Sequence, residues 1–304
     1  MSPFGYARPR SLTEAHDLLE SRPDGQVRVL VGGTDLIVGL QSGVIAPDLV
    51  LDIKHLDDLP AGVTHADGVT RISATTSLTR VIEDARVREL FPALVEAALV
   101  VGSVQIRNRA TVTGNICNAS PAADTAPALL AYDAVVVLSS RAGERRVPLT
   151  RFLLGPRRTD VRPGELVAAV ELPDPPPGLG AAHGRLTRRR GVDLATLSLV
   201  CLVGARRTRF AFGAVAPTPF VVDDDSGVLA DAHAGDDARE QVLREVTARA
   251  RPITDVRAGA DYRQAMLLVL SRRARRDALA SRDARPGSDL GGPTPSDPPA
   301  EADA

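Results

Sequence analysis

Two short glycine-containing segments carry residue types that can hold a phosphate-bearing ligand. The first, Val31 to Leu36 (VGGTDL), closes a strand-like apolar run that begins at Val27. Glycine lets the main chain pass close to a ligand, and the exposed N–H groups of such a turn can bind a pyrophosphate, with the Thr34 hydroxyl as a further donor. The same pattern also fits an ordinary tight turn between a strand and a helix. Taken alone, this segment leaves both interpretations open.

The second segment, Thr111 to Ile116 (TVTGNI), places hydroxyls, an amide and one glycine between apolar residues. A polar loop between buried segments suits a cofactor that is part apolar ring and part polar chain. The alternative is a simple capped connection. Asp124 falls in the first turn of the next expected helix, where it either complements the helix dipole or accepts hydrogen bonds from a sugar or ribityl hydroxyl.

Metal, hydrolytic and Rossmann-type chemistry finds little support in the sequence. The 5 histidines are scattered, and none stands at ligand spacing with another His or Cys. The motifs H-E-x-x-H, G-x-S-x-G, G-x-x-x-x-G-K and G-x-G-x-x-G are all absent. The 2 cysteines, Cys117 and Cys201, are too few for a disulfide scaffold or a four-cysteine iron–sulfur cluster. We expect them to be reduced thiols in a cytosolic protein.

Composition limits the partners. The chain has 304 residues, 44% of them hydrophobic, and a net charge of -1, so neither nucleic acid nor an anionic membrane is expected to bind. The longest mostly apolar stretch, Leu194 to Ala205, is much shorter than the roughly 20 residues of a membrane span. The N-terminus has no apolar signal region. We therefore expect a cytoplasmic protein with no membrane span.

The elements that must position the two loops fall into three segments, which we predict as residues 1–55, 56–176 and 181–281. The first holds a helix capped by Ser11 and ending near Glu20, with strands at 27–31 and 48–53 around a helical turn at 34–41. The second holds strands at 69–74, 134–139 and 166–172, a helix at 90–101, a polar loop at 111–118 and a helix from Ser120-Pro121 to about Tyr132.

A proline-rich linker, PDPPPGLG at 173–180, precedes the third segment. That segment holds strands at 195–203 and 210–215 and helices at 239–250 and 262–279. Residues 285–304 are rich in proline and glycine and lack an apolar period, so we expect a disordered, dispensable tail.

Longer stretches resemble one family. VGGTDL, QIRNRATVTGNICNASPAADTAPALL and VPLTRFLLGPRRTDVRPGELVAAVELP resemble the flavin-binding module of the xanthine dehydrogenase and carbon monoxide dehydrogenase family of molybdenum hydroxylases. RLTRRRGVDLATLSLV, FGAVAPTP and PITDVRAGADYRQAMLLVL resemble that family's C-terminal flavoprotein domain. The resemblance covers roughly residues 3–280 in order, and its middle motif is long and specific.

The resemblance implies an α+β (split α/β) fold. It consists of a vanillyl-alcohol-oxidase-type FAD-binding domain in two subdomains, followed by a domain of a small antiparallel sheet with helices. The implied cofactor is FAD, and the implied contacts are as follows. The FAD pyrophosphate would lie on the main chain where the first-segment strand ends, at Leu30, Val31, Gly32, Gly33, Thr34, Asp35 and Leu36. The second loop would line the other side with Thr111, Thr113, Gly114 and Asn115. Asp124 would meet a polar group of the cofactor, the Val167 main chain would pass near the adenine, and Arg185 would lie near the flavin.

The implied function is an electron-transfer subunit. A large subunit with a molybdenum cofactor would hydroxylate an aromatic heterocycle or aldehyde, and a small subunit with two [2Fe–2S] clusters would relay electrons to FAD. The flavin would pass them to NAD⁺, oxygen or another acceptor, and no catalytic acid or base is required of this chain.

Three positions depart from the family pattern. Ala110 and Thr113 replace glycine, and Arg185 replaces lysine, which keeps the charge but not the compact ammonium geometry. They leave a second hypothesis open, a non-catalytic scaffold whose FAD site has decayed. A third, a free-standing flavin oxidase, would need a substrate base, and no histidine or tyrosine cluster supplies one.

Overall fold

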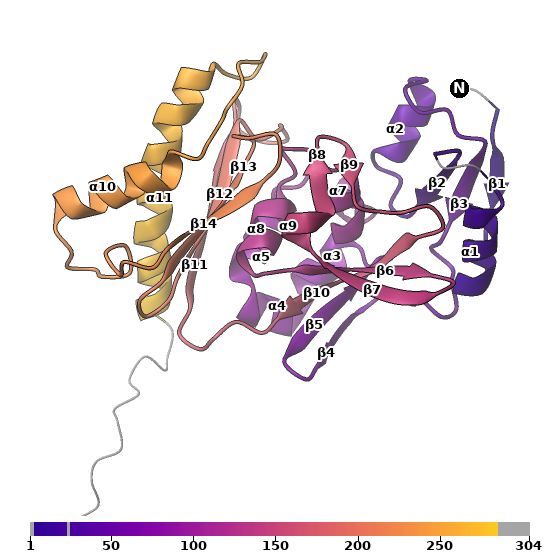
Figure 1. Ribbon diagram of the computed structural model, residues 1–304, viewed down its shortest axis with the longest axis horizontal. Helices are drawn as coiled ribbons and strands as arrows, with labels where there is room; N and C mark the ends of the chain where they lie inside the picture. Colours follow the sequence, from indigo (N-terminus) through magenta and orange to yellow (C-terminus); the bar gives the residue numbers. More distant parts are fainter. Residues whose placement is uncertain (1–2, 23–24, 285–304) are drawn as a thin grey trace, which may run out of the picture.

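Three sheets of three or more strands follow one another along the elongated molecule (Figure 1). The computed structural model describes residues 3–22 and 25–284, so the tail predicted at 285–304 lies outside the described residues. A three-stranded sheet lies at the N-terminal end, a five-stranded sheet in the middle and a four-stranded sheet at the C-terminal end. This is the mixed α+β arrangement expected from the sequence.

The N-terminal sheet is parallel and has the order β1-β3-β2. Its elements are β1 (Gly5–Ala7), α1 (Leu12–Glu20), β2 (Val27–Leu30), α2 (Leu36–Gln41) and β3 (Leu49–Asp52). The Ser11 side chain caps α1 as predicted, accepting the Glu14 N–H at 3.2 Å. Because β2 and β3 are parallel, their carboxyl ends share one edge, and the VGGTDL loop leaves the sheet there.

The middle sheet has the order β4-β5-β10-β6-β7, with every neighbouring pair antiparallel. Its strands are β4 (Val63–Ala66), β5 (Val69–Ser73), β6 (Val135–Ser140), β7 (Gly143–Pro148) and β10 (Leu166–Pro173). Short helices pack over it: α3 (Leu78–Glu83), α4 (Ala85–Leu90), α5 (Pro92–Leu99), α6 (Val104–Arg107), α7 (Val112–Cys117) and α8 (Thr125–Ala131). A short connection follows β7, comprising α9 (Leu149–Phe152), β8 (Leu153–Gly155) and β9 (Arg158–Thr159).

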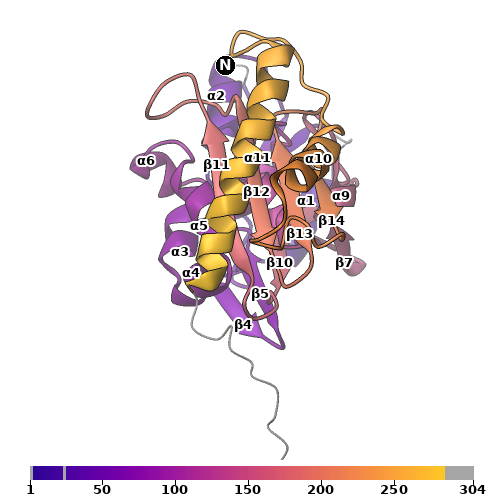
Figure 2. The ribbon, with the colours of Figure 1, turned by 90° about the vertical axis from the view of Figure 1, so that its left-hand side faces the viewer.

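The C-terminal sheet is antiparallel and is buried on both faces. Its elements are β11 (Gly180–Leu186), β12 (Leu197–Val203), β13 (Thr208–Gly213), β14 (Phe220–Asp224), α10 (Asp236–Thr247) and α11 (Ala260–Asp283). Leu199 and Cys201 pack with α10 and α11, and α11 lies across β11 and β12 (Figure 2). Val200 and Leu202 pack instead with the core of the middle sheet. Packing on both sides explains why residues 195–203 lack the polar alternation of a half-exposed strand.

Three predicted elements are wrong in detail. The predicted loop 111–118 is a helix, α7, because the Thr111 hydroxyl caps it by accepting the Gly114 N–H at 2.9 Å. The helix predicted at 90–101 is present as α5 but spans only Pro92–Leu99. Leu90 instead ends α4, and Phe91 separates the two helices, since Pro92 disfavours helical geometry in the residue before it. The helix predicted to start at Ser120 begins only at Thr125; the Pro121 carbonyl instead accepts the Ala214 N–H at 2.7 Å.

Within the described ranges, no helix combines the length and apolar character that crossing a bilayer requires.

Candidate functional site

The VGGTDL loop contains consecutive main-chain N–H groups that donate no hydrogen bond within the described part of the chain. Gly33 adopts a φ of +78°, a conformation that favours glycine, and turns the chain between β2 and α2. Among the hydrogen bonds of the described residues, none uses the N–H of Gly32, Gly33, Thr34 or Asp35 as its donor. Consecutive free N–H groups in a turn of this kind form an anion-binding concavity. The four residues are called the N–H cradle below.

A second loop, distant in sequence, closes one side of the N–H cradle. A methyl group added at Gly32 would lie 2.3 Å from the Arg109 carbonyl oxygen and 3.0 Å from the Ala110 Cα. The Asn118 amide also reaches across, and its Nδ2 lies 3.3 Å from Asp35 Oδ1. Only glycine permits so close an approach of the two main chains. The structure therefore brings together the two segments that the sequence singled out.

The four predicted residues at the start of α7 have different surroundings. Thr111 and Thr113 are both buried, and the Thr113 hydroxyl donates to the Ala74 carbonyl at 2.9 Å. Asn115 Oδ1 accepts the Thr125 hydroxyl at 2.6 Å, whereas Gly114 is exposed in the first turn of the helix. Gly114 is thus exposed and Asn115 is half-buried, whereas the Thr113 side chain is directed into the protein.

Val167 is connected to this region through its neighbour Ala168. It lies in β10 beside a register irregularity between Val167 and Ala169, and its side chain is buried. The neighbouring Ala168 carbonyl accepts the Ala74 N–H at 2.8 Å. Because the Ala74 carbonyl binds Thr113, a short chain of hydrogen bonds joins the irregular part of β10 to α7.

Asp124 and Arg185 are far apart in the sequence but form an ion pair that joins the middle and C-terminal parts of the chain. Arg185 Nε lies 2.8 Å from Asp124 Oδ1, and both side chains are 11% exposed. Burial raises the pKa of Asp124 above its usual value, and the Arg185 guanidinium opposes part of that rise. Arg185 also donates to the Asp193 carbonyl. The pair fixes the end of β11 against the start of α8.

Sequence reasoning missed His183, which lies two residues before Arg185 on β11 and faces the same side. Its Nε2 is buried with no hydrogen-bond partner among the described residues, and its main-chain N–H donates to Glu96 Oε2 at 3.2 Å. Burial, assisted by the Arg185 charge, lowers the pKa of His183 from 6.5 to about 4, so the imidazole is neutral at physiological pH. Alternation along β11 is the signal that could have linked it to Arg185.

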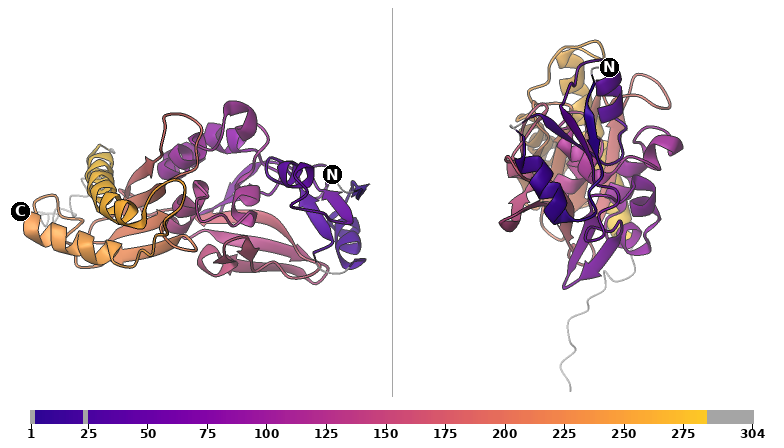
Figure 3. Two further views of the ribbon diagram at one scale, coloured as in Figure 1. Left: turned by 90° about the horizontal axis from the view of Figure 1, so that it is seen from above. Right: turned by 90° about the vertical axis from the view of Figure 1, so that its right-hand side faces the viewer.

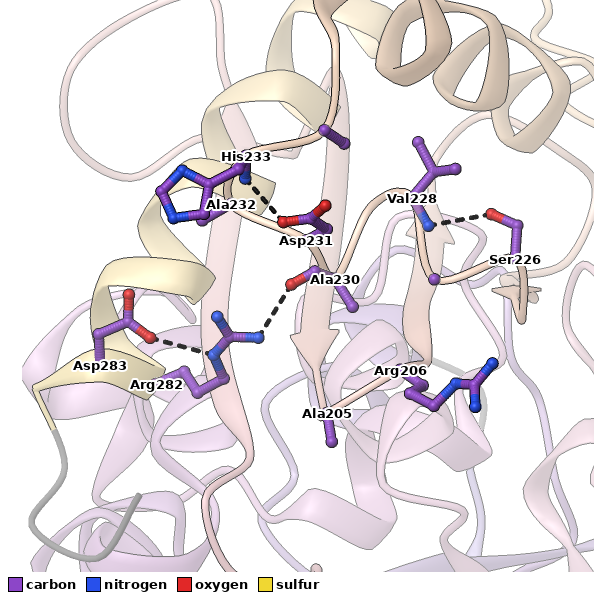
Figure 4. A pocket seen from close by; sticks show the side chains of 12 residues that line it. Ala205, Arg206, Ser226, Val228, Ala230, Asp231, Ala232, His233, Arg282 and Asp283 are labelled. Carbon is purple, nitrogen blue, oxygen red and sulfur yellow. Dashed lines mark hydrogen bonds and ion pairs between the residues drawn. The ribbon is translucent and has the colours of Figure 1, made fainter. Parts of the chain in front are cut away.

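Other parts of the described chain offer less chemistry. No group of three or more His, Cys, Asp or Glu in that part could hold a metal ion. A hollow of about 700 Å³ lies on the C-terminal domain, beside Arg206, His233 and Arg282 (Figure 4). Arg282 is held there by the Ala230 carbonyl at 3.0 Å and by Asp283 at 3.1 Å. The residues that line this hollow include none from the N–H cradle or from the Asp124–Arg185 pair.

Comparison with known proteins identifies the family of the chain. Residues 2–175 match the FAD binding domain in molybdopterin dehydrogenase, and residues 183–278 match the CO dehydrogenase flavoprotein C-terminal domain. The chain is 32% identical over 285 residues to the xanthine dehydrogenase FAD-binding subunit of Escherichia coli O157:H7, covering 91% of this chain and 96% of that protein. It is 32% identical over 276 residues to the glyceraldehyde dehydrogenase medium chain of Sulfolobus acidocaldarius, covering 89% and 96%.

A solved structure shares the whole architecture. A chain of carbon monoxide dehydrogenase from Hydrogenophaga pseudoflava superposes with a TM-score of 0.85 at 28% identity, covering 92% of this chain and 99% of that one. The fold and the N–H cradle thus define a FAD-binding flavoprotein subunit of an oxidoreductase. The chain belongs to the family of FAD-binding subunits of xanthine and carbon monoxide dehydrogenase-type molybdenum hydroxylases. The expected fold class, family and cofactor are confirmed.

Proposed function

We propose that this chain transfers electrons within a three-part complex, from [2Fe–2S] clusters of a small partner subunit to NAD⁺ or another acceptor. A large partner subunit with a molybdenum cofactor would carry out the hydroxylation. Relatives named as a medium chain or FAD-binding subunit support a division of labour among chains. The 2 cysteines of this chain are too few to ligate a cluster of its own, which supports a separate iron–sulfur partner. We place the complex in the cytoplasm.

The free N–H groups of the cradle carry this proposal. Gly32 to Asp35 would hold the FAD pyrophosphate by main-chain donation, with Leu30, Val31 and Leu36 shaping the turn. Thr111, Thr113, Gly114 and Asn115 would form the facing wall, with Val167 beside the adenine. The Asp124–Arg185 pair would place one carboxylate and one guanidinium against the polar parts of the cofactor. When bound, FAD supplies the redox chemistry by collecting electrons singly and releasing them in pairs.

The residues of this chain therefore act by binding and orienting. The Arg185 charge lies where it would favour a negatively charged, reduced flavin. We also propose that the functional units correspond to residues 1–55, 56–176 and 181–281.

The scaffold hypothesis gains no support from its three residues. Ala110 packs at Gly32 and the Thr113 hydroxyl binds Ala74, so neither occupies the donors of the cradle. Arg185 keeps a cation in place through its pair with Asp124.

The test separates flavin binding from substrate oxidation. The purified chain should be yellow, with one FAD per chain, and anaerobic addition of a purine or an aldehyde should leave its flavin oxidised. Co-expression with the large and small partner subunits should give rapid bleaching by the substrate of the complex. Rapid bleaching of the isolated chain by an organic substrate would instead identify a self-sufficient oxidase. A colourless, folded chain that assembles with the partners would identify a scaffold.

A further inference from the structure

Two segments from different domains lie side by side on one flank of the molecule. In Figures 2 and 3, α6 projects beside the loop that follows β11. The two are connected through α5, whose Glu96 accepts the main-chain N–H of His183 in β11 at 3.2 Å. We call the surface formed by Leu99, residues 104–109 and residues 187–195 the arginine rim.

The arginine rim exposes an unusual number of aliphatic side chains. Their exposed fractions are large: Leu99 47%, Val104 59%, Ile106 38%, Val192 55% and Leu194 59%. Isolated exposed aliphatic residues are ordinary, but a group of five from adjoining segments marks an interaction surface.

The same surface is strongly cationic although the whole chain has a net charge of -1. Residues 104–109 and 187–195 contain five arginines (Arg107, Arg109, Arg188, Arg189, Arg190) and a single carboxylate, Asp193. Asp193 is 4% exposed and is bound by Arg188 at 3.1 Å, so its charge is compensated. Arg190 is exposed and has no ion-pair partner among the described residues. The arginine rim therefore presents net positive charge to solvent.

Both halves of the arginine rim are built directly on the flavin site. The Arg109 carbonyl touches Gly32 of the N–H cradle, and Arg185, which pairs with Asp124, donates to the Asp193 carbonyl. A molecule bound on the arginine rim would thus lie next to the cofactor.

We propose that the arginine rim docks an acidic one-electron redox protein that accepts electrons from the flavin. This inference rests on the proposed electron-transfer function. The cationic charge of the arginine rim argues for an acidic acceptor, because redox encounter complexes are small and steered by complementary charge. One anionic reduced flavin would release two electrons and one proton. Two acceptor molecules would each take up one electron, and the proton would pass to solvent.

The test measures electron transfer from the full-length, photoreduced flavoprotein under anaerobic conditions. Cytochrome b5, an acidic one-electron haem protein, and cytochrome c, a basic one, are the probes. At low salt, cytochrome b5 should be reduced by the unmodified chain about tenfold faster than by the double variant Arg189→Glu/Arg190→Glu, and the difference should shrink above about 0.3 M salt. Cytochrome c should show the opposite change. Arg206→Glu is the matched control, because Arg206 is exposed by the hollow of Figure 4 and lies outside the arginine rim.

Several results would overturn the proposal. Equal cytochrome b5 rates for the unmodified chain and the double variant would show that the arginine rim is not used. An effect confined to NAD⁺ reduction would assign the arginines to a dinucleotide. Loss of the iron–sulfur subunit from the purified complex would assign them to a stable subunit contact. Flavin absorbance of each variant separates these failures from failure of the proposed function, since a chain without flavin would reduce neither probe.

Discussion

Gly32→Ala is the change that tests the cradle most directly. The new methyl group would lie 2.3 Å from the Arg109 carbonyl oxygen and 2.9 Å from its carbonyl carbon. Both are main-chain atoms, so no side-chain rotation relieves the contact. The VGGTDL loop and the loop before α7 must therefore separate before an alanine fits.

The expected magnitude follows from this overlap. Forcing one extra carbon into a packed region costs about 1–3 kcal/mol. If the two loops stay in contact, the strain lowers the stability of the fold. If the two loops separate, the strain lowers FAD affinity instead, because FAD binding has to bring the loops together again. We expect the second result, with FAD affinity reduced between about 5-fold and about 150-fold, since about 1.4 kcal/mol corresponds to tenfold. The melting temperature should fall by only a few degrees.

The assay is the flavin absorbance per chain after dialysis, followed by titration of the apoprotein with FAD. Gly62→Ala is the control, because a methyl group there has no heavy atom within 4 Å. An unchanged FAD affinity in Gly32→Ala, with a normal melting temperature, would refute the view that this contact shapes the cofactor site.

Further predictions concern single features. Gly33→Val should fold yet remain colourless, because a left-handed φ of +78° costs an L-residue about 1–2 kcal/mol and disturbs the donors; normal flavin content would remove Gly33 from the cradle. His183 should make the fold acid-sensitive: its pKa of about 4 lies below the ordinary 6.5, so its stabilising contribution is full above pH 6.5 and is lost as the pH falls toward 4. Over this pH range the free energy of unfolding, measured with urea, should fall by about 3 kcal/mol less in His183→Gln than in the unmodified chain. Parallel pH profiles of the two proteins would refute this assignment. Arg185→Lys should keep the flavin but lower stability by about 1 kcal/mol, since an ammonium group does not reproduce the contacts to Asp124 and the Asp193 carbonyl; complete loss of flavin would show that the guanidinium itself holds the cofactor. Removal of residues 285–304 should leave flavin content and melting temperature unchanged, and a clear drop in either would show that the tail contributes.

Local chemistry made part of the fold readable from the sequence. The Ser11 cap, the glycine pair after a strand and the apolar runs of β6, β10 and β12 are determined by neighbouring residues, and the structure contains each of them. The α7 helix was missed because one glycine and two β-branched threonines argue against a helix, whereas the Thr111 cap argues for one. The interruption between α4 and α5 at Phe91 also has a local cause, since Pro92 follows Phe91, and the sequence alone could have predicted it.

What the sequence by itself determined was two candidate ligand segments, a glycine turn after a strand and a polar segment beginning at Thr111. The resemblance of longer stretches to one family then implied that the ligand is FAD. Only the tertiary structure decided which residues meet. It set the approach of Gly32 to Arg109, the pairing of Asp124 with Arg185, the inward direction of the Thr113 hydroxyl and the burial of His183. The physical reason is that local spacing fixes conformation over a few residues. Main-chain approaches and buried ion pairs between distant segments depend instead on how whole sheets and helices pack, and no short stretch of sequence contains that information.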